Sequence, residues 1–264
     1  MLHSRFVIIS WWSNCLALAC IQRLLAHAPG RPLIVVQAGK SPQQRERLRR
    51  ALPPGVQELH YPENAPAEHS RVLAAVACDY LRCESGLWFI DHDVFLQAAA
   101  ADWFAAADQR FAAADTVLCV AAGARQHAIT QPAFWLSPQR LPAHIACFDP
   151  IPFHSGKEAQ RPDLYRFDGA LRMPQKDTLV QARDDLAARG QVATYSDFPA
   201  HQHLGGLFMF AGPLDYPPQF HDWMRSTARQ FLDFYATCPP HWLALEDPVL
   251  LRRVYEFAEA LHVR

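Results

Sequence analysis

The 264-residue chain lacks an excess of positive charge. Its 25 lysine and arginine residues are balanced by 26 aspartate and glutamate residues, which leaves a formal net charge of -1. A protein without a basic field has no general attraction for nucleic acid or anionic lipid. Arg45, Arg47, Arg49 and Arg50 lie close together, but on an expected surface helix they predict a solvated face. We therefore expect no nucleic-acid partner.

The chain also lacks cysteine pairs and long apolar segments. None of its seven cysteines forms a Cys-x-x-Cys pair, and this odd, scattered set argues against a zinc ribbon or a disulfide framework. Segment 6–26 is apolar-rich, but Ser10, Ser13 and Asn14 interrupt it, so it predicts a strand, a turn and a helix. We predict no integral membrane span and a cytoplasmic protein, with a peripheral position at the inner face of the membrane left open.

What the chain does contain is an alternation of strand and helix patterns. Short apolar runs predict strands at 6–10, 33–36, 56–61, 87–90 and 116–120. Helical spacing and caps predict helices at 14–28, with Asn14 as the N-cap, and at 43–51, 66–83 and 98–113. This alternation implies a mainly parallel sheet covered on both faces, with ligands at the carboxyl ends of its strands.

The second half of the chain is less regular. Residues 121–200 are rich in proline and show few clean periods. The patterned segments that remain are a helix at 178–189, a strand at 204–210, and amphipathic helices at 220–236 and 247–261. Because no repeat or linker divides the chain, we predict a single domain, 1–264, with a first half to residue 125 and a second half from residue 126.

Two carboxylates mark the end of the expected strand at 87–90. Asp91 and Asp93 follow its apolar run, and side chains at i and i+2 of an extended chain point the same way. Two like charges at this spacing repel each other unless a cation lies between them or one is protonated. A hard divalent ion that carries the phosphates of a nucleotide meets this need. Solvated acids at a strand end are the structural alternative.

The order of these features resembles the nucleotide-sugar-binding half of GT-A fold glycosyltransferases. An Asp-x-Asp ends a middle strand, His203–Phe210 is similar to the glycine-containing strand on the acceptor side, and Glu246–Arg253 is similar to the Glu-Asp-x-x-Leu-x-x-Arg segment of inverting family 2 and its relatives. The resemblance covers most of 5–125 and 203–255. It implies an α/β fold of GT-A type, a Rossmann-like nucleotide-diphospho-sugar transferase sandwich with a mainly parallel central sheet.

The activity that this resemblance implies is metal-dependent transfer of a hexosyl group from a UDP- or GDP-sugar to an acceptor hydroxyl, with inversion. Asp91 and Asp93, with His203 as a candidate third ligand, would hold Mn2+ or Mg2+ against the leaving diphosphate. Asp247 is the candidate base for the acceptor hydroxyl, and Glu246 is the second candidate. The acceptor could be a saccharide, a glycolipid, a peptide or a small molecule.

The resemblance also implies a set of donor contacts. These are Ser10, Trp11, Gln37, His69, Arg71, Asp91, Gly205 and Gly206. A base could stack on the Trp11 indole, and the two glycines would let the backbone approach a ligand closely. The structural alternatives are core packing for Trp11, a tight bend at the glycines, and helix capping by Glu246 and Asp247.

Two other functions stay open. A nucleotidyltransferase has a related fold but usually carries a glycine-rich, basic loop after the first strand, and Trp11–Asn14 is not such a loop. A degenerate transferase fold that serves as a scaffold predicts loss of the acids, which are present. The chain departs from the family pattern in this first loop, and also at His92, whose side chain we expect to point away from the metal.

Overall fold

The computed structural model describes residues 4–61, 69–98, 100–122, 133–143, 165–168, 171–174, 179–204 and 221–259. Gly205 and Gly206, and with them nearly all of the expected strand at 204–210, lie outside them.

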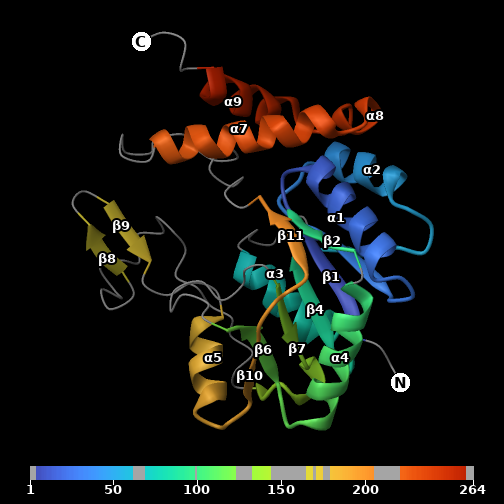
Figure 1. Ribbon diagram of the computed structural model, residues 1–264, viewed down its shortest axis with the longest axis vertical. Coiled ribbons are helices and arrows are strands. Elements are labelled where there is room, and N and C mark those ends of the chain that lie inside the picture. The colour runs from blue at the N-terminus through green and yellow to red at the C-terminus, as the bar shows by residue number, and fades with distance from the viewer. Residues whose placement is uncertain are drawn as a thin grey trace.

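A seven-stranded sheet forms the centre of the described chain (Figure 1). In spatial order its strands are β10 (Val192–Tyr195), β6 (Leu118–Ala121), β7 (Ala133–Leu136), β4 (Leu87–Asp91), β1 (Arg5–Ser10), β2 (Leu33–Gln37) and β3 (Gln57–His60). Neighbours pair in parallel except where β7 meets β4 and β6. The expected α/β fold with a mainly parallel sheet is therefore confirmed.

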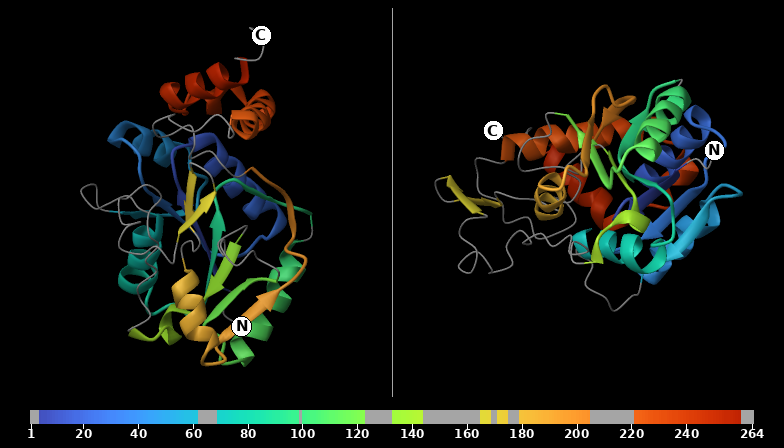
Figure 2. Two further views of the ribbon diagram at one scale, coloured as in Figure 1. Left: turned by 90° about the vertical axis from the view of Figure 1, so that its left-hand side faces the viewer. Right: turned by 90° about the horizontal axis from the view of Figure 1, so that it is seen from below.

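The central strands are continuous apolar runs because both of their faces are covered. Alternate residues of β1 enter different cores: Val7 and Ile9 belong to one apolar cluster, and Phe6 and Ile8 to another. The helices on the Val7 side are α3 (His69–Ala75), its π-helical continuation (Val76–Tyr80) and α5 (Val180–Ala187); those on the Phe6 side are α1 (Asn14–His27), α2 (Pro42–Ala51) and α4 (Ala100–Ala113). Figure 2 shows α3 and α4 on opposite faces of the sheet.

The last three helices pack against the start of α1. They are α7 (His221–Thr237), α8 (Pro240–Leu243) and α9 (Pro248–Glu259). A third apolar cluster joins Cys15 and Leu16 of α1 to Phe231 of α7 and Val254 of α9, all fully buried. This packing places α7, α8 and α9 across the edge of the sheet at which α1 begins (Figure 1).

Several elements differ from the sequence-based expectation. The N-cap of α1 is Ser13, whose Oγ accepts a hydrogen bond from the Leu16 amide at 3.1 Å, and not Asn14. The irregular region 121–200 and the residues that follow it contain strands that were not expected: β7, β10, the hairpin of β8 (Tyr165–Asp168) and β9 (Leu171–Pro174), and β11 (Ala200–His203). Each has only four residues, in sequence with few clean periods. Among the described residues, no helix is both long enough and apolar enough to cross a membrane.

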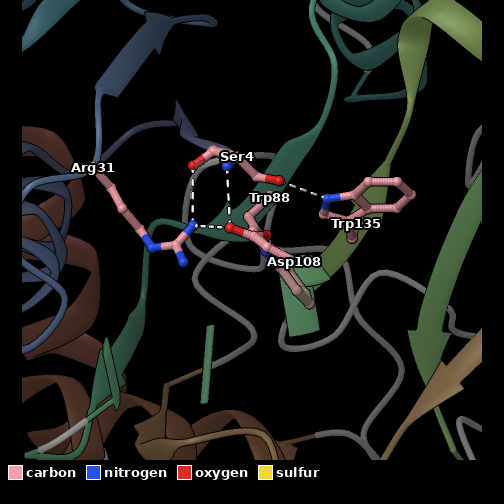
Figure 3. A network of polar contacts seen from close by, with 5 residues as sticks. All are labelled: Ser4, Arg31, Trp88, Asp108 and Trp135. Carbon is pink, nitrogen blue, oxygen red and sulfur yellow. Dashed lines mark hydrogen bonds and ion pairs between the residues drawn. The ribbon is translucent and has the colours of Figure 1, made fainter. Parts of the chain in front are cut away.

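A buried ion pair ties the amino edge of the sheet together (Figure 3). Nη1 of Arg31 donates to Oδ2 of Asp108 at 2.6 Å and to the carbonyl of Ser4 at 3.1 Å. Asp108 also accepts from the Ser4 amide at 3.1 Å and from Nε1 of Trp88 at 3.2 Å, while Nε1 of Trp135 donates to Oγ of Ser4 at 2.9 Å. These five residues form the amino-edge network, in which the buried charges have matched partners.

Candidate metal and donor site

The carboxyl end of β4 places two acids side by side. Asp91 is the last residue of β4, where it pairs with Ile9 of β1, and Asp93 follows two residues later. The Asp93 carboxylate is buried, with 6% of the residue exposed, whereas Asp91 is half-buried. Ligand atoms of both acids lie within 4.8 Å of each other, as expected, but a turn at residues 92–93 brings them together and not an extended chain.

A second pair of strands brings a histidine to these acids. β5 (Val94–Leu96) pairs antiparallel with β11, which sets His203 opposite Val94, and the Leu204 amide donates to the Asp93 carbonyl at 3.1 Å. Nε2 of His203 consequently lies 3.3 Å from Oδ1 of Asp93 and 3.6 Å from Oδ2 of Asp91. The three residues form the Asp91–Asp93–His203 cluster.

The electrostatics of the cluster favour charged acids. Burial alone would lower the pKa of His203, but the hydrogen bond with Asp93 and the charges of Asp93 and Asp91 outweigh it and raise that pKa above its ordinary value. Burial would likewise raise the pKa of Asp93, yet the interaction with His203 lowers it. A cation at this place therefore meets an ionised Asp93 carboxylate.

The donor set suits a divalent ion. Two carboxylate oxygens and one imidazole nitrogen, all within 4.8 Å of one another, can bind one ion from one side and leave other positions for phosphate oxygens or water. Carboxylate and imidazole ligands are typical of Mn2+ sites, and a more oxygen-rich shell completed by phosphate suits Mg2+. The residues present thus fit the metal that the sequence predicts.

His92, the residue between the two acids, is buried. Burial lowers its pKa to about 4, although the neighbouring Asp93 charge acts in the opposite direction. Among the described residues its Nε2 has no hydrogen-bond partner. His92 also lines a small cavity with Asp91, Trp11, Leu73 and other apolar residues. It is therefore a neutral imidazole beside the cluster and not a member of it.

The ends of β1 and β2 are joined by a buried lysine that the sequence did not single out. Nζ of Lys40 donates to Oγ of Ser10 at 2.5 Å and to Oδ1 of Asn14 at 2.6 Å. Burial lowers the pKa of Lys40 to about 7, and the Glu246 charge partly opposes this shift. Ser10, a predicted donor contact, is fully buried and already bonded to this ammonium group.

Trp11 and Gln37, also predicted donor contacts, are buried too. The Trp11 indole is 6% exposed and packs against Gly39, where a Cβ would lie 2.8 Å from the ring. Gly39 has φ +64°, so glycine is favoured there for both reasons. Nε2 of Gln37 donates to Glu58 at 2.6 Å and to the carbonyl of Arg45 at 3.1 Å. Both side chains therefore have structural roles. Their contact with the nucleotide-sugar donor stays a prediction.

Two other predicted donor contacts, His69 and Arg71, lie on α3. His69 begins the described part of α3, and Arg71 is exposed on the same helix. Gly205 and Gly206 lie outside the described residues. Their roles in donor binding stay predictions.

Glu246 and Asp247, the two candidate bases, have different surroundings. Glu246 is 2% exposed and accepts hydrogen bonds from the Ser13 hydroxyl, from the Asn14 amide at 3.0 Å and from the Cys15 amide at 3.3 Å. It therefore caps the N-terminus of α1 and not α9, which begins two residues later at Pro248. Asp247 is half-buried and caps α9, since its Oδ1 accepts from the Val249 amide at 2.8 Å.

Comparison with solved structures identifies the type of fold. No protein-family model and no curated protein matches the sequence. Among solved structures, the chain is similar to the mannosyltransferase PcManGT from Pyrobaculum calidifontis in complex with GDP-Man and Mn2+, at 12% identity over 99% of this chain and 76% of that one, with a TM-score of 0.52.

Two further structures are similar at lower scores. One is a putative nucleotide-diphospho-sugar transferase from Desulfovibrio desulfuricans G20, at 9% identity over 98% of both chains and a TM-score of 0.49. The other is the galactosyltransferase LgtC in complex with donor and acceptor sugar analogs, at 12% identity over 72% of both chains and a TM-score of 0.46. At these identities the likeness concerns the fold alone. The chain has a fold of the GT-A type, similar to that of PcManGT.

Proposed function

We propose that this protein is a metal-dependent glycosyltransferase that moves a sugar from a nucleotide-diphosphate donor to an acceptor hydroxyl. The observation that carries the proposal is the Asp91–Asp93–His203 cluster, which lies at the carboxyl edge of a mainly parallel sheet. Ligands of open α/β sheets bind at this edge. PcManGT, which shares the fold, is described in complex with GDP-Man and Mn2+.

Each member of the cluster has a role in this proposal. Asp93 and Asp91 hold Mn2+ or Mg2+ as ionised oxygen ligands, and His203 completes the set through neutral Nε2. The bound ion supplies Lewis-acid stabilisation of the diphosphate leaving group. The nucleotide of a UDP- or GDP-sugar lies over the ends of β1 and β2, where Lys40 holds the Ser10 hydroxyl in place.

We further propose inversion, with Asp247 as the base that takes the proton of the acceptor hydroxyl. Between the two candidate bases, Asp247 is favoured because the Glu246 oxygens are occupied by the start of α1. The half-buried Asp247 keeps a carboxylate oxygen that can face an acceptor hydroxyl. The single chain would thus carry a donor half and an acceptor half, with a saccharide, glycolipid, peptide or small molecule as acceptor.

The test is calorimetric titration with UDP and GDP, each with and without Mn2+. We expect one nucleotide to bind wild type in the presence of Mn2+. We expect Asp93→Asn to abolish the part of this binding that depends on the metal. Asp115→Asn is the matched control, because Asp115 is an exposed acid in a loop away from the cluster. Failure of UDP, GDP, CDP and dTDP to bind with Mn2+ would overturn the proposal.

Two product assays then separate the finer parts of the proposal. Proton NMR of the first transferred sugar reports the anomeric configuration, and retention would refute the role given to Asp247. Release of pyrophosphate from a nucleoside triphosphate and a sugar phosphate would instead identify a nucleotidyltransferase. Binding of the nucleotide without any transfer or hydrolysis would favour a scaffold.

A further inference from the structure

A second hollow lies apart from the metal cluster. It is a groove of about 520 Å3 between α1, the junction of α7 with α8, and the β5–β11 pair. Sites for small molecules have volumes of roughly 300–1,000 Å3. None of the three cluster residues is among the described residues that line it. We refer to it as the α1–α7 groove.

Three aromatic side chains line the α1–α7 groove. The rings of Phe95 and Phe234 stack with their centroids 5.5 Å apart, and Trp242 from α8 lines the same groove. Phe95 is buried, whereas Phe234 and Trp242 are half-buried and keep ring surface accessible. The face of an aromatic ring carries partial negative charge, so it attracts the polarised C–H groups of a sugar ring as well as apolar surface.

Two amide side chains accompany the aromatic rings. Gln22 on α1 and Gln202 on β11 both line the groove and are exposed. No hydrogen bond of either side chain is present within the described part of the chain. Each amide offers an acceptor oxygen and two donor hydrogens, the combination that sugar hydroxyls require.

The groove has basic side chains in its lining. Arg23 and His27 line it from α1, with Nη1 of Arg23 3.5 Å from Nε2 of His27. No aspartate or glutamate is among the described residues of the lining. A guanidinium is always charged, and its planar fork matches a carboxylate or a phosphate. The groove is therefore complementary to an anion that also has a ring to stack.

We propose that the α1–α7 groove binds an acidic saccharide. The sugar ring packs on Phe234 and Trp242, the hydroxyls bond to Gln22 and Gln202, and the carboxylate or phosphate pairs with Arg23. A purely apolar ligand would leave the two amides without partners and the guanidinium without an anion, which costs free energy wherever the ligand covers them. The inference goes beyond the proposed function, because it concerns a different groove and does not require sugar transfer.

The experiment is calorimetric titration of the full chain without metal or nucleotide. The acidic probes are a hyaluronan tetrasaccharide, which carries carboxylates, and mannose 6-phosphate; chitotetraose is the neutral probe of matched length. We expect at least one acidic probe to bind and chitotetraose to bind at least tenfold more weakly. The two acidic probes distinguish a carboxylate from a phosphate as the recognised group.

Variants locate the binding. Arg23→Gln should weaken binding of the acidic probe at least tenfold. Arg47→Gln, the same change at an exposed arginine of α2, should leave that binding unchanged. Gln202→Ala should weaken binding of the acidic probe severalfold, because it removes hydrogen bonds to the sugar hydroxyls. All three positions are exposed, so the three variants are expected to fold, and circular dichroism checks this.

Three results would overturn the inference. They are no binding of either acidic probe, equal binding of chitotetraose, and equal loss in the Arg23 and Arg47 variants. Binding to phosphatidylglycerol vesicles that depends on Arg23, without binding of either acidic sugar, would assign the groove to a lipid surface instead. Because Mn2+ and nucleotide are absent, failure here is distinct from failure of the proposed transferase activity.

Discussion

The two edges of the central sheet hold buried charge in different ways. At the amino edge, the Asp108 carboxylate receives hydrogen bonds from Arg31, from the Ser4 amide and from Trp88, so its charge is matched within the protein. At the carboxyl edge, Asp91 and Asp93 lie close together and share one imidazole, that of His203. The first arrangement is matched by groups of the protein itself, whereas the second would be suited to a divalent cation.

This difference separates structural charges from functional ones. A buried ion pair with all partners in place is costly to break, because removal of one partner leaves the other charge buried. Converging like charges have a cost in the unliganded protein and are typical of sites that bind an ion. We therefore expect substitutions at the amino edge to change stability, and substitutions at the carboxyl edge to change the response to ligands.

The largest effect is expected at the amino edge. Asp108→Ala leaves the Arg31 guanidinium buried without its carboxylate, so the free energy of unfolding should fall by about 3–5 kcal/mol. Urea unfolding followed by circular dichroism measures this, with Asp115→Ala at an exposed position as the control. A loss below about 1 kcal/mol would contradict the structural role of the amino-edge network.

The carboxyl edge should respond to metal instead. Mn2+ at about 100 times its Kd should raise the unfolding free energy of wild type by about 2.7 kcal/mol, since it binds only the folded state. Asp93→Asn should abolish this gain, and Asp115→Asn should keep it. Thermal unfolding with Mn2+ or with EDTA provides the measurement, and an unchanged gain in Asp93→Asn would remove Asp93 from the metal site.

The lowered pKa of Lys40 predicts that the stability of the fold depends on pH. Its pKa is lowered to about 7 in the folded state from 10.5, so folded protein binds fewer protons than unfolded protein between these values. Below pH 7 Lys40 is charged in both states and the cost of burying that charge is present in full; the cost disappears as the pH rises. Stability attributable to Lys40 should increase by about 2 kcal/mol between pH 7 and pH 9.

Comparison of wild type with Lys40→Met isolates this contribution. Urea unfolding at pH 7 and pH 9 should show that the difference in stability between the two proteins changes with pH in favour of wild type. Parallel pH profiles would mean that Lys40 titrates normally. The variant also tests whether the Ser10 hydroxyl needs its ammonium partner for nucleotide binding.

The smallest effect is expected from a matched pair of serines. Ser4→Ala removes the acceptor for Nε1 of Trp135, a buried donor, and should cost about 1–2 kcal/mol. Ser137 is equally buried, but its hydroxyl has no partner among the described residues, so Ser137→Ala should be nearly neutral. Equal unfolding free energies for the two variants would contradict the contribution assigned to the Trp135 hydrogen bond.

The sequence was most informative where structure depends on neighbours in the chain. The strands β1, β2 and β4 were predictable because apolar runs of five or so residues are read locally. β7 and β10 were missed because the sequence around them shows few clean periods, and their places depend on partners elsewhere in the sheet. Lys40 was missed because nothing in the loop after β2 marks a lysine that folding will bury.

The sequence by itself determined the α/β class and the order of the main strands, because each follows from spacing between nearby residues. It also predicted that Asp91 and Asp93 converge, although a turn and not an extended chain brings them together. Only the tertiary structure decided that His203 reaches these acids, since this requires β11 to pair with β5. It also decided that Glu246 caps α1, whose first amide lies 232 positions away along the chain. The difference has a physical reason: periodicity records local geometry, whereas burial and charge pairing depend on which distant segments pack together.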